Sequence, residues 1–194
     1  MTRIIGGTLA GRRLAVPGNG ARPTTDRVRE AVFNSLTHRI GDWSTCRALD
    51  LFAGSGALGL EALSRGAATA TLVDRDREAV GVMRGNVAAL GLAGQATIIV
   101  ADATRWVPPT GTAYDLVFID PPYAIAARTI AAVVLSLSAS GALGPQALLV
   151  VERSVRDADA PWPAGWAAGD RRRYGETAVW YGLAQGAKTE LEDL

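Results

Sequence analysis

The run Asp120-Pro121-Pro122-Tyr123 contains the residue types that could hold and alkylate an amine. It follows residues 114–119, an apolar stretch that predicts a buried strand. A carboxylate, a backbone carbonyl and an aromatic ring would then meet at the carboxyl edge of a sheet, where open α/β sheets bind ligands. This set suits methylation of an exocyclic amine on a nucleobase. A run of this kind can also be a plain proline-rich exit from a strand, so the rest of the chain must decide.

The proposed chemistry gives roles to three members of this run. If Asp120 and the carbonyl of Pro121 each accept one N–H, the amine nitrogen can pyramidalise and aim its lone pair at an activated methyl group. Positioning of this kind contributes up to about 7–11 kcal/mol, and Tyr123 would stack on the base. A general base is not required, because the alkylated ammonium is strongly acidic. The single histidine, His38, is accordingly expected to be a surface residue.

A glycine-rich turn, Asp50-Leu-Phe-Ala-Gly54-Ser-Gly56, lies between a predicted strand and a predicted helix. Glycines at such a turn let the backbone approach a ligand closely. With Gly59 they spell G-x-G-x-x-G, which is also the dinucleotide fingerprint. The turn therefore indicates either NAD or S-adenosylmethionine, the common methyl donor.

Four aspartates close four successive predicted strands: Asp50, Asp74, Asp102 and Asp120. They suit a ligand that carries an ammonium (Asp50), a ribose diol (Asp74), an adenine amine (Asp102) and a reactive sulfonium. A pyrophosphate would be repelled by Asp50, and no basic residue lies between Gly54 and Glu61, so the methyl donor is favoured over NAD. Each aspartate alone could instead be a helix cap. The expected donor site also includes the neighbours Phe52, Ser55, Gly56, Arg75 and Ala103.

Short apolar strands alternate with helical stretches along the chain, which predicts βαβ units and a mostly parallel sheet. Strands are expected at 46–52, 69–74, 95–100, 114–119 and 147–152, and helices at 26–40, 58–64, 76–90 and 125–138. Residues 171–174 and 177–183 predict an antiparallel closing hairpin, which brings the sheet to seven strands. Residues 2–16 predict a separate short hairpin.

The bulk composition is that of one ordinary domain. The chain has 194 residues, a net charge of +1 and one cysteine, Cys46. A reducing cytoplasm fits, and no disulfide or metal centre is expected. The most membrane-like segment, residues 124–143, contains Arg128 and many small residues and is interpreted as a buried helix. A monomer is expected.

The sequence also resembles a known family over nearly its whole length. The residues that carry the resemblance are Arg3-Ile-Ile-Gly-Gly7, Arg22-Pro-Thr-Thr-Asp-Arg-Val-Arg-Glu30, Phe33-Asn34, the glycine turn, D-P-P-Y and Tyr174-Gly175-Glu176-Thr177. They look like the bacterial small-subunit ribosomal RNA guanine-N2 methyltransferases of the D type. The resemblance implies a Rossmann-like class I methyltransferase fold, S-adenosylmethionine as donor, and a loop guanine of 16S rRNA in the small ribosomal subunit as acceptor.

The resemblance also implies a division of the chain and further site residues. Residues 1–20 would form a hairpin extension for RNA, residues 21–184 the methyltransferase domain and residues 185–194 a tail. Thr25, Arg27 and Asn34 would lie near the donor or the entering base. The residues expected to contact RNA are Arg3, Arg12, Arg13, Arg22 and Arg27.

Three other functions stay open at this point. The acceptor could be adenine N6 in DNA or another RNA, because this amine also presents two N–H donors. The glycine motif alone would permit a small NAD(P)-dependent reductase. The chain could also be a non-catalytic RNA-binding or ribosome-assembly module that retains the fold.

Overall fold

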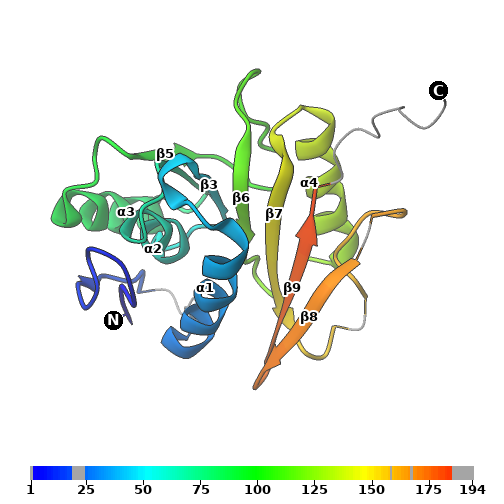
Figure 1. Cartoon of the computed structure of the whole chain (residues 1–194), viewed down its shortest axis with the longest axis horizontal. Helices are drawn as coiled ribbons and strands as arrows, with labels where there is room; N and C mark the ends of the chain where they lie inside the picture. The colour runs from blue at the N-terminus through cyan, green and yellow to red at the C-terminus, as the bar shows by residue number, and fades with distance from the viewer. Residues whose placement is uncertain (1, 19–24, 158, 167, 185–194) are drawn as a thin grey trace.

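The computed structural model describes residues 2–18, 25–157, 159–166 and 168–184 (Figure 1). Its helices are α1 (Asp26–Ile40), α2 (Ala57–Ser64), α3 (Arg77–Leu90) and α4 (Ala127–Ala139), with a short 3₁₀ turn at Trp43–Thr45. Its strands are β1 (Thr2–Arg3), β2 (Arg13–Leu14), β3 (Arg47–Leu51), β4 (Thr69–Asp74), β5 (Ala96–Val100), β6 (Tyr114–Ile119), β7 (Leu143–Ser154), β8 (Ala168–Tyr174) and β9 (Thr177–Leu183). Every predicted helix and strand is present.

Seven of the strands form one sheet in the order β5-β4-β3-β6-β7-β9-β8. The strands from β5 to β7 are parallel, whereas β9 is antiparallel to both β7 and β8. This arrangement confirms the mostly parallel seven-stranded sheet with its antiparallel C-terminal hairpin. The order reverses at β3, which places the carboxyl ends of β3 and β6 at a topological switch point.

The boundaries of β7 differ most from the prediction. The strand begins at Leu143 and not at Ala147, because it continues through Pro145. Proline lacks the N–H that a strand ladder needs. Its position coincides with a register shift between Tyr114 and Leu116 in the pairing with β6. The irregular pairing there accommodates the proline, and the sequence alone does not reveal it.

Helices cover the sheet on both faces, and alternate residues of each strand face opposite layers. In β6, Leu116 and Phe118 join a core cluster with residues of α1, α2 and α3, whereas Val117 and Ile119 join a second cluster with α4. Figure 1 shows α1 and α4 on opposite faces of the sheet. Among the described residues, no helix has both the length and the apolar character to cross a membrane.

The N-terminal hairpin of β1 and β2 shares the first core cluster, because Ile4 and Leu14 are buried in it. The buried carboxylate of Glu61 on α2 accepts hydrogen bonds from the backbone N–H groups of Ile5 (2.7 Å) and Gly6 (2.8 Å). Glu61 also pairs with Arg65 at 2.9 Å and with the buried Arg29 at 3.7 Å. The hairpin is therefore fixed to α1 and α2 by a buried ionic network.

Candidate donor and acceptor site

A cavity of about 510 Å³ lies at the carboxyl ends of the parallel strands. This volume falls within the range of small-molecule sites, roughly 300–1,000 Å³. Of the predicted site residues, the structure brings into its lining Asp50, Phe52, Gly54, Ser55, Asp74, Arg75, Asp102, Ala103, Asp120, Pro121, Pro122 and Tyr123. All four strand-end aspartates and the whole D-P-P-Y run thus meet in one cavity.

The glycine turn forms one wall of this cavity. Its backbone takes positive φ angles at Phe52 (62°), Gly54 (56°) and Gly56 (79°). Phe52 is the one described residue other than glycine with a positive φ, and strain of this kind clusters at functional sites. The buried Asn86 of α3 braces the turn, because its side-chain amide donates to the carbonyl of Ser55 at 2.9 Å.

Asp50 lies at the base of the cavity with 1% of its surface exposed. Its Oδ2 accepts a hydrogen bond from the backbone N–H of Gly59 at 2.9 Å. Burial raises the pKa of Asp50 to about 8, opposed by this hydrogen bond, and the nearby Asp120 and Asp74 raise it further. A cation placed beside Asp50 would favour the ionised carboxylate. The residue therefore fits an ammonium group better than a phosphate.

Asp74 and Asp102 both hold the backbone around the cavity. Asp74 accepts from the N–H of Gly54 at 2.8 Å and from the N–H of Asp76 at 2.8 Å. Asp102 accepts from the N–H and the hydroxyl of Thr104 at 2.9 and 2.8 Å, and these bonds lower its pKa. The helix-cap alternative does not apply to these two aspartates, because the N-cap of α3 is Asp76 and no described helix begins after Asp102 until α4. Each carboxylate oxygen of Asp74 has a second lone pair that can still accept a ligand hydroxyl. Oδ1 of Asp102 accepts both bonds from Thr104, so a ligand amine would donate to Oδ2, which lies 3.5 Å from Arg75.

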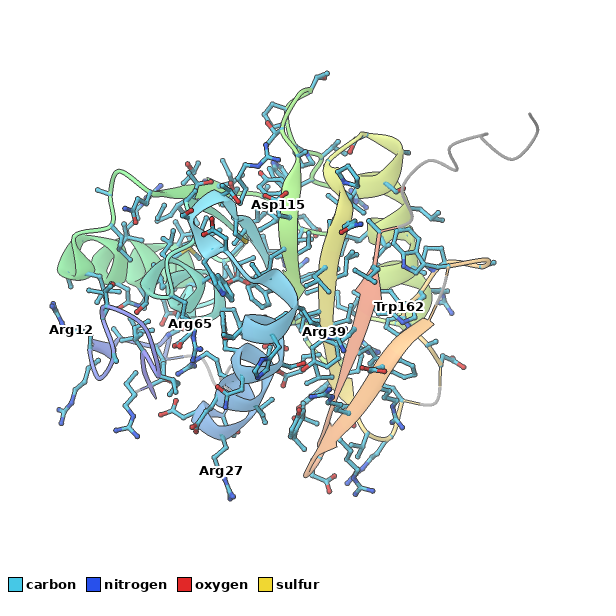
Figure 2. The ribbon with its side chains drawn as sticks, in the orientation of Figure 1. Arg12, Arg27, Arg39, Arg65, Asp115 and Trp162 are labelled. Atoms are coloured by element: carbon cyan, nitrogen blue, oxygen red, sulfur yellow. The ribbon has the colours of Figure 1, made fainter. Side chains whose placement is uncertain are left out.

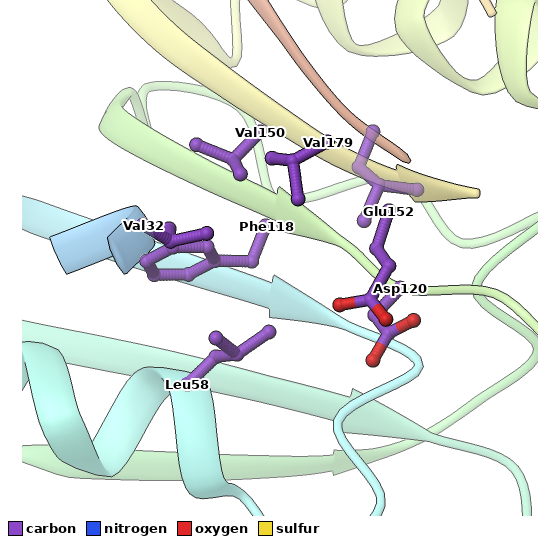
Figure 3. Close-up of a pocket in the computed structure, with 8 residues that line it drawn as sticks. Val32, Leu58, Phe118, Asp120, Val150, Glu152 and Val179 are labelled. Atoms are coloured by element: carbon purple, nitrogen blue, oxygen red, sulfur yellow. The ribbon is translucent and has the colours of Figure 1, made fainter. Parts of the chain in front are cut away.

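The acceptor end of the cavity combines rigid and exposed parts. Pro121 is buried, Asp120 is partly buried, and Tyr123 exposes 55% of its surface. A second carboxylate, that of Glu152 on β7, lines the same end. Asp120 and Glu152 also line a small apolar cavity of about 10 Å³ above the sheet, and Figure 3 shows their carboxyl groups side by side at its mouth. The acceptor end therefore carries two acids, of which the sequence pointed to one.

Other predicted residues lie outside the cavity lining. Thr25 is exposed and accepts from the N–H of Val28 at 3.4 Å as the N-cap of α1. Asn34 is exposed on α1, and Gly56 is buried as the cap of α2. The roles of Thr25 and Asn34 at the donor or base stay predictions.

The predicted RNA contacts are surface residues wherever they are described. Arg3, Arg12, Arg13 and Arg27 are exposed. Figure 2 shows Arg12 and Arg27 pointing outward from the body of the protein. Arg12 donates to the carbonyl of Ala89 at 2.7 Å. Arg22 lies outside the described residues. The predicted surface position of His38 is confirmed.

Sequence reasoning missed three parts of the site. The sequence predicts Glu152 only as the last residue of a strand. An acid at the end of an apolar run was a signal that could have indicated a site residue. Asn86 gave no signal, because its partners Ala15 and Ser55 are far away in the chain. Val16 and Pro17 also line the cavity, so the exit of the N-terminal hairpin borders the site.

Comparison with known proteins agrees with this architecture. The family model described as conserved hypothetical protein 95 matches residues 2–182. Ribosomal RNA small subunit methyltransferase D of Escherichia coli is 42% identical over 177 residues, which cover 91% of this chain and 86% of that protein. A solved structure of the Escherichia coli protein yhhF is 40% identical with a TM-score of 0.80, and the match covers 95% of this chain and 98% of the other.

A more distant solved structure shows the shared fold. It is an RNA methyltransferase from Salinibacter ruber in complex with S-adenosyl-L-homocysteine, 16% identical with a TM-score of 0.64. The match covers 89% of this chain and all of the other. The Rossmann-like class I methyltransferase fold is thereby confirmed. The chain belongs to the family described as conserved hypothetical protein 95, the family of the small-subunit ribosomal RNA methyltransferase D proteins that its motifs resemble.

Proposed function

We propose that this protein transfers a methyl group from S-adenosylmethionine to the exocyclic N2 amine of one guanine in 16S rRNA, within the assembled small subunit. The observation that carries the proposal is the meeting of Asp120, Pro121 and Tyr123 with the glycine turn and Asp50 in one cavity. The Escherichia coli relative is named as a small-subunit ribosomal RNA methyltransferase, which supports this acceptor. A monomer acting in the cytoplasm accords with the proposal.

The donor end of the cavity suits the groups of S-adenosylmethionine. Asp50 is buried and would hold the ammonium, Asp74 would accept from the ribose hydroxyls, and Asp102 would accept from the adenine amine. Ala103 is buried at the lining and gives an apolar surface for the adenine ring. When bound, the donor supplies an electrophilic methyl group on a sulfonium, which passes to the amine nitrogen and leaves a neutral thioether.

The acceptor end orients the amine. Asp120 and the carbonyl of Pro121 would each accept one N–H of the N2 amine, which directs the nitrogen lone pair toward the donor end. Pro121 and Pro122 fix the backbone that carries this carbonyl. After transfer the nitrogen would be acidic, and Asp120 would lie next to it to accept the proton. Tyr123 presents an exposed ring on which the flipped guanine can stack.

Selection of the RNA must come from the surface around the cavity. The hairpin exit at Val16 and Pro17 borders the site, and Arg3, Arg12, Arg13 and Arg27 are exposed. Arginine forks bind phosphate oxygens well. The protein would recognise the shape of a folded loop, which is the common mode for RNA.

The carboxylate of Asp120 gives the direct test. In Asp120→Ala, we expect methyl transfer to small subunits from a strain lacking the gene to fall by about 100- to 1,000-fold, the usual effect of removing one positioned polar group. The affinity for S-adenosylmethionine, measured by calorimetry, should stay within a few-fold. Unchanged methylation in this variant would contradict the role of Asp120.

Two further measurements identify the acceptor and the donor. Mass spectrometry of rRNA from the deletion strain should show one missing N2-methylguanine, whereas a missing N6-methyladenine would favour the adenine alternative. Calorimetry with NAD should show no binding. Binding of NAD without binding of S-adenosylmethionine would favour a reductase.

A further inference from the structure

The second carboxylate at the acceptor end, Glu152, has no role in the chemistry described above. It continues a row of β7 side chains whose preceding members on the same face, Leu148 and Val150, belong to the first core cluster. Another apolar residue would continue that row without introducing charge. The carboxyl group of Glu152 lines both cavities together with that of Asp120. A ligand with two adjacent N–H donors could give one hydrogen bond to each carboxyl group.

A neighbouring strand contacts Glu152. The hydroxyl of Thr177, the first residue of β9, lies 3.5 Å from Oε1 of Glu152. Thr177 ends the Tyr174-Gly175-Glu176-Thr177 motif, which is distant from D-P-P-Y in the chain. Pairing of Glu152 with Val179 and of Ser154 with Thr177 brings this motif to the acceptor end. The late motif thus contributes to the site through Glu152.

We propose that Glu152 accepts a hydrogen bond from N1–H of the target base and thereby selects guanine. This inference rests on the proposed function and names a residue that determines its specificity. Guanine presents N1–H next to its N2 amine, so the base offers adjacent donors to Glu152 and Asp120. Adenine and cytosine present an unprotonated ring nitrogen beside their amines, and this lone pair would face the Glu152 carboxylate. Asp120 and Pro121 alone cannot make this distinction, because all three amines carry two N–H donors.

The base 2-aminopurine tests the proposal with the unaltered protein. It keeps the amine at C2 but lacks the proton on N1. Small subunits would be reconstituted with 16S rRNA in which the guanine identified by mass spectrometry is replaced by 2-aminopurine. We expect kcat/KM for this substrate to fall by about 10- to 100-fold, the usual effect of losing a hydrogen bond to a charged group. Equal rates on the two substrates would overturn the inference.

The variant Glu152→Gln should discriminate less between guanine and 2-aminopurine than the unaltered protein does. A glutamine amide can accept from N1–H of guanine or donate to N1 of 2-aminopurine. We therefore expect the ratio of kcat/KM for guanine over 2-aminopurine to fall at least about 10-fold below that of the unaltered protein. Calorimetry with S-adenosylmethionine should give an unchanged affinity, which confirms that the variant is folded. An unchanged ratio in a folded variant would overturn the inference.

Glu176→Gln is the matched control. Glu176 lies in the turn between β8 and β9, is exposed, and is not part of the cavity lining. The variant removes the same charge close to the site and should leave the ratio unchanged. An equal effect in both variants would assign the discrimination to general charge and overturn the inference. If the unaltered protein places no methyl group on guanine N2, the proposed function itself fails, which is a distinguishable result.

Discussion

At the scale of single residues, burial of Asp50 favours its protonated form, whereas its proposed role of holding an ammonium group requires the ionised form. Its carboxylate is almost fully buried, and its pKa is raised from 3.8 to about 8. Between these two pH values the folded protein holds a proton that the unfolded chain releases. The free energy of unfolding of the ligand-free protein should therefore decrease as the pH rises across this range, by up to about 1.4 kcal/mol per pH unit from this residue.

The variant Asp50→Asn tests this reasoning. Asparagine still accepts the hydrogen bond from Gly59 but does not ionise. In urea denaturation between about pH 5 and about pH 9, the variant should lack the loss of stability seen in the unaltered protein, while its affinity for S-adenosylmethionine decreases. Glu30→Gln, an exposed carboxylate on α1, should keep the slope of the unaltered protein. An identical slope in Asp50→Asn would show that Asp50 ionises normally in the folded state.

Tyr123 is the second residue whose role can be isolated. Its ring is 55% exposed at the acceptor end, and stacking of a base on an aromatic ring contributes about 1–3 kcal/mol. Tyr123→Ala should therefore lower kcat/KM for the RNA by about 5- to 150-fold, as steady-state methylation assays would measure. Tyr123→Phe retains the ring and should stay close to the unaltered protein. Similar losses in both variants would indicate a role for the hydroxyl instead of stacking.

At the scale of elements, the N-terminal hairpin makes a close backbone contact with α2 at Ser64. The N–H of Thr8 donates to the carbonyl of Ser64 at 2.7 Å. A Cβ added at Gly7 would lie 1.9 Å from that carbonyl oxygen, and Gly7 has a φ of 80°. Gly11 has a nearly equal φ of 82°, but a Cβ there would meet no atom within 4 Å. A substitution at Gly11 would therefore introduce backbone strain alone, whereas a substitution at Gly7 would add a clash with α2.

Alanine at each position should give different losses of stability. Gly11→Ala should cost about 1–2 kcal/mol, the strain of a left-handed residue. Gly7→Ala should cost about 1–3 kcal/mol more, because the hairpin must also move off α2. Urea denaturation measures both values. Equal losses would mean that the hairpin can shift away from Ser64 without a penalty.

The elements also show what could be predicted from the sequence. Apolar runs of strand length and glycine turns predicted the boundaries of β3, β4 and β6 to within one residue, because both signals are local. The strand-end rule likewise predicted that Asp50, Asp74, Asp102 and Asp120 meet. Glu152 and Asn86 escaped prediction, because their roles depend on contacts between segments far apart in the chain. The start of β7 was not predicted for the same reason. Pro145 argues against a strand in the sequence, and only the irregular pairing with β6 explains how the strand accommodates it.

At the scale of the whole molecule, charge is unevenly placed although the net charge is only +1. Exposed arginines of the N-terminal hairpin, Arg12 and Arg13, lie on the element whose exit borders the cavity. Arg47, in contrast, begins β3 at the amino edge of the sheet, where it lies 3.3 Å from Asp115. The fold therefore supplies exposed arginines at two places, one near the cavity and one on the opposite edge.

The salt dependence of RNA binding distinguishes these two sites. Each phosphate contact contributes about 0.7 to 0.9 to the slope of log K against log salt concentration. If Arg12 and Arg13 each contact a phosphate, the double variant with alanine at both positions should reduce that slope by about 1.4 to 1.8. Arg47→Ala should leave the slope unchanged, because RNA that reaches Tyr123 from the carboxyl edge would not extend to the amino edge of β3. Filter binding of small subunits over a salt series measures both slopes. An effect of Arg47→Ala as large as that of the double variant would mean that the RNA is attracted by total charge and not by the hairpin.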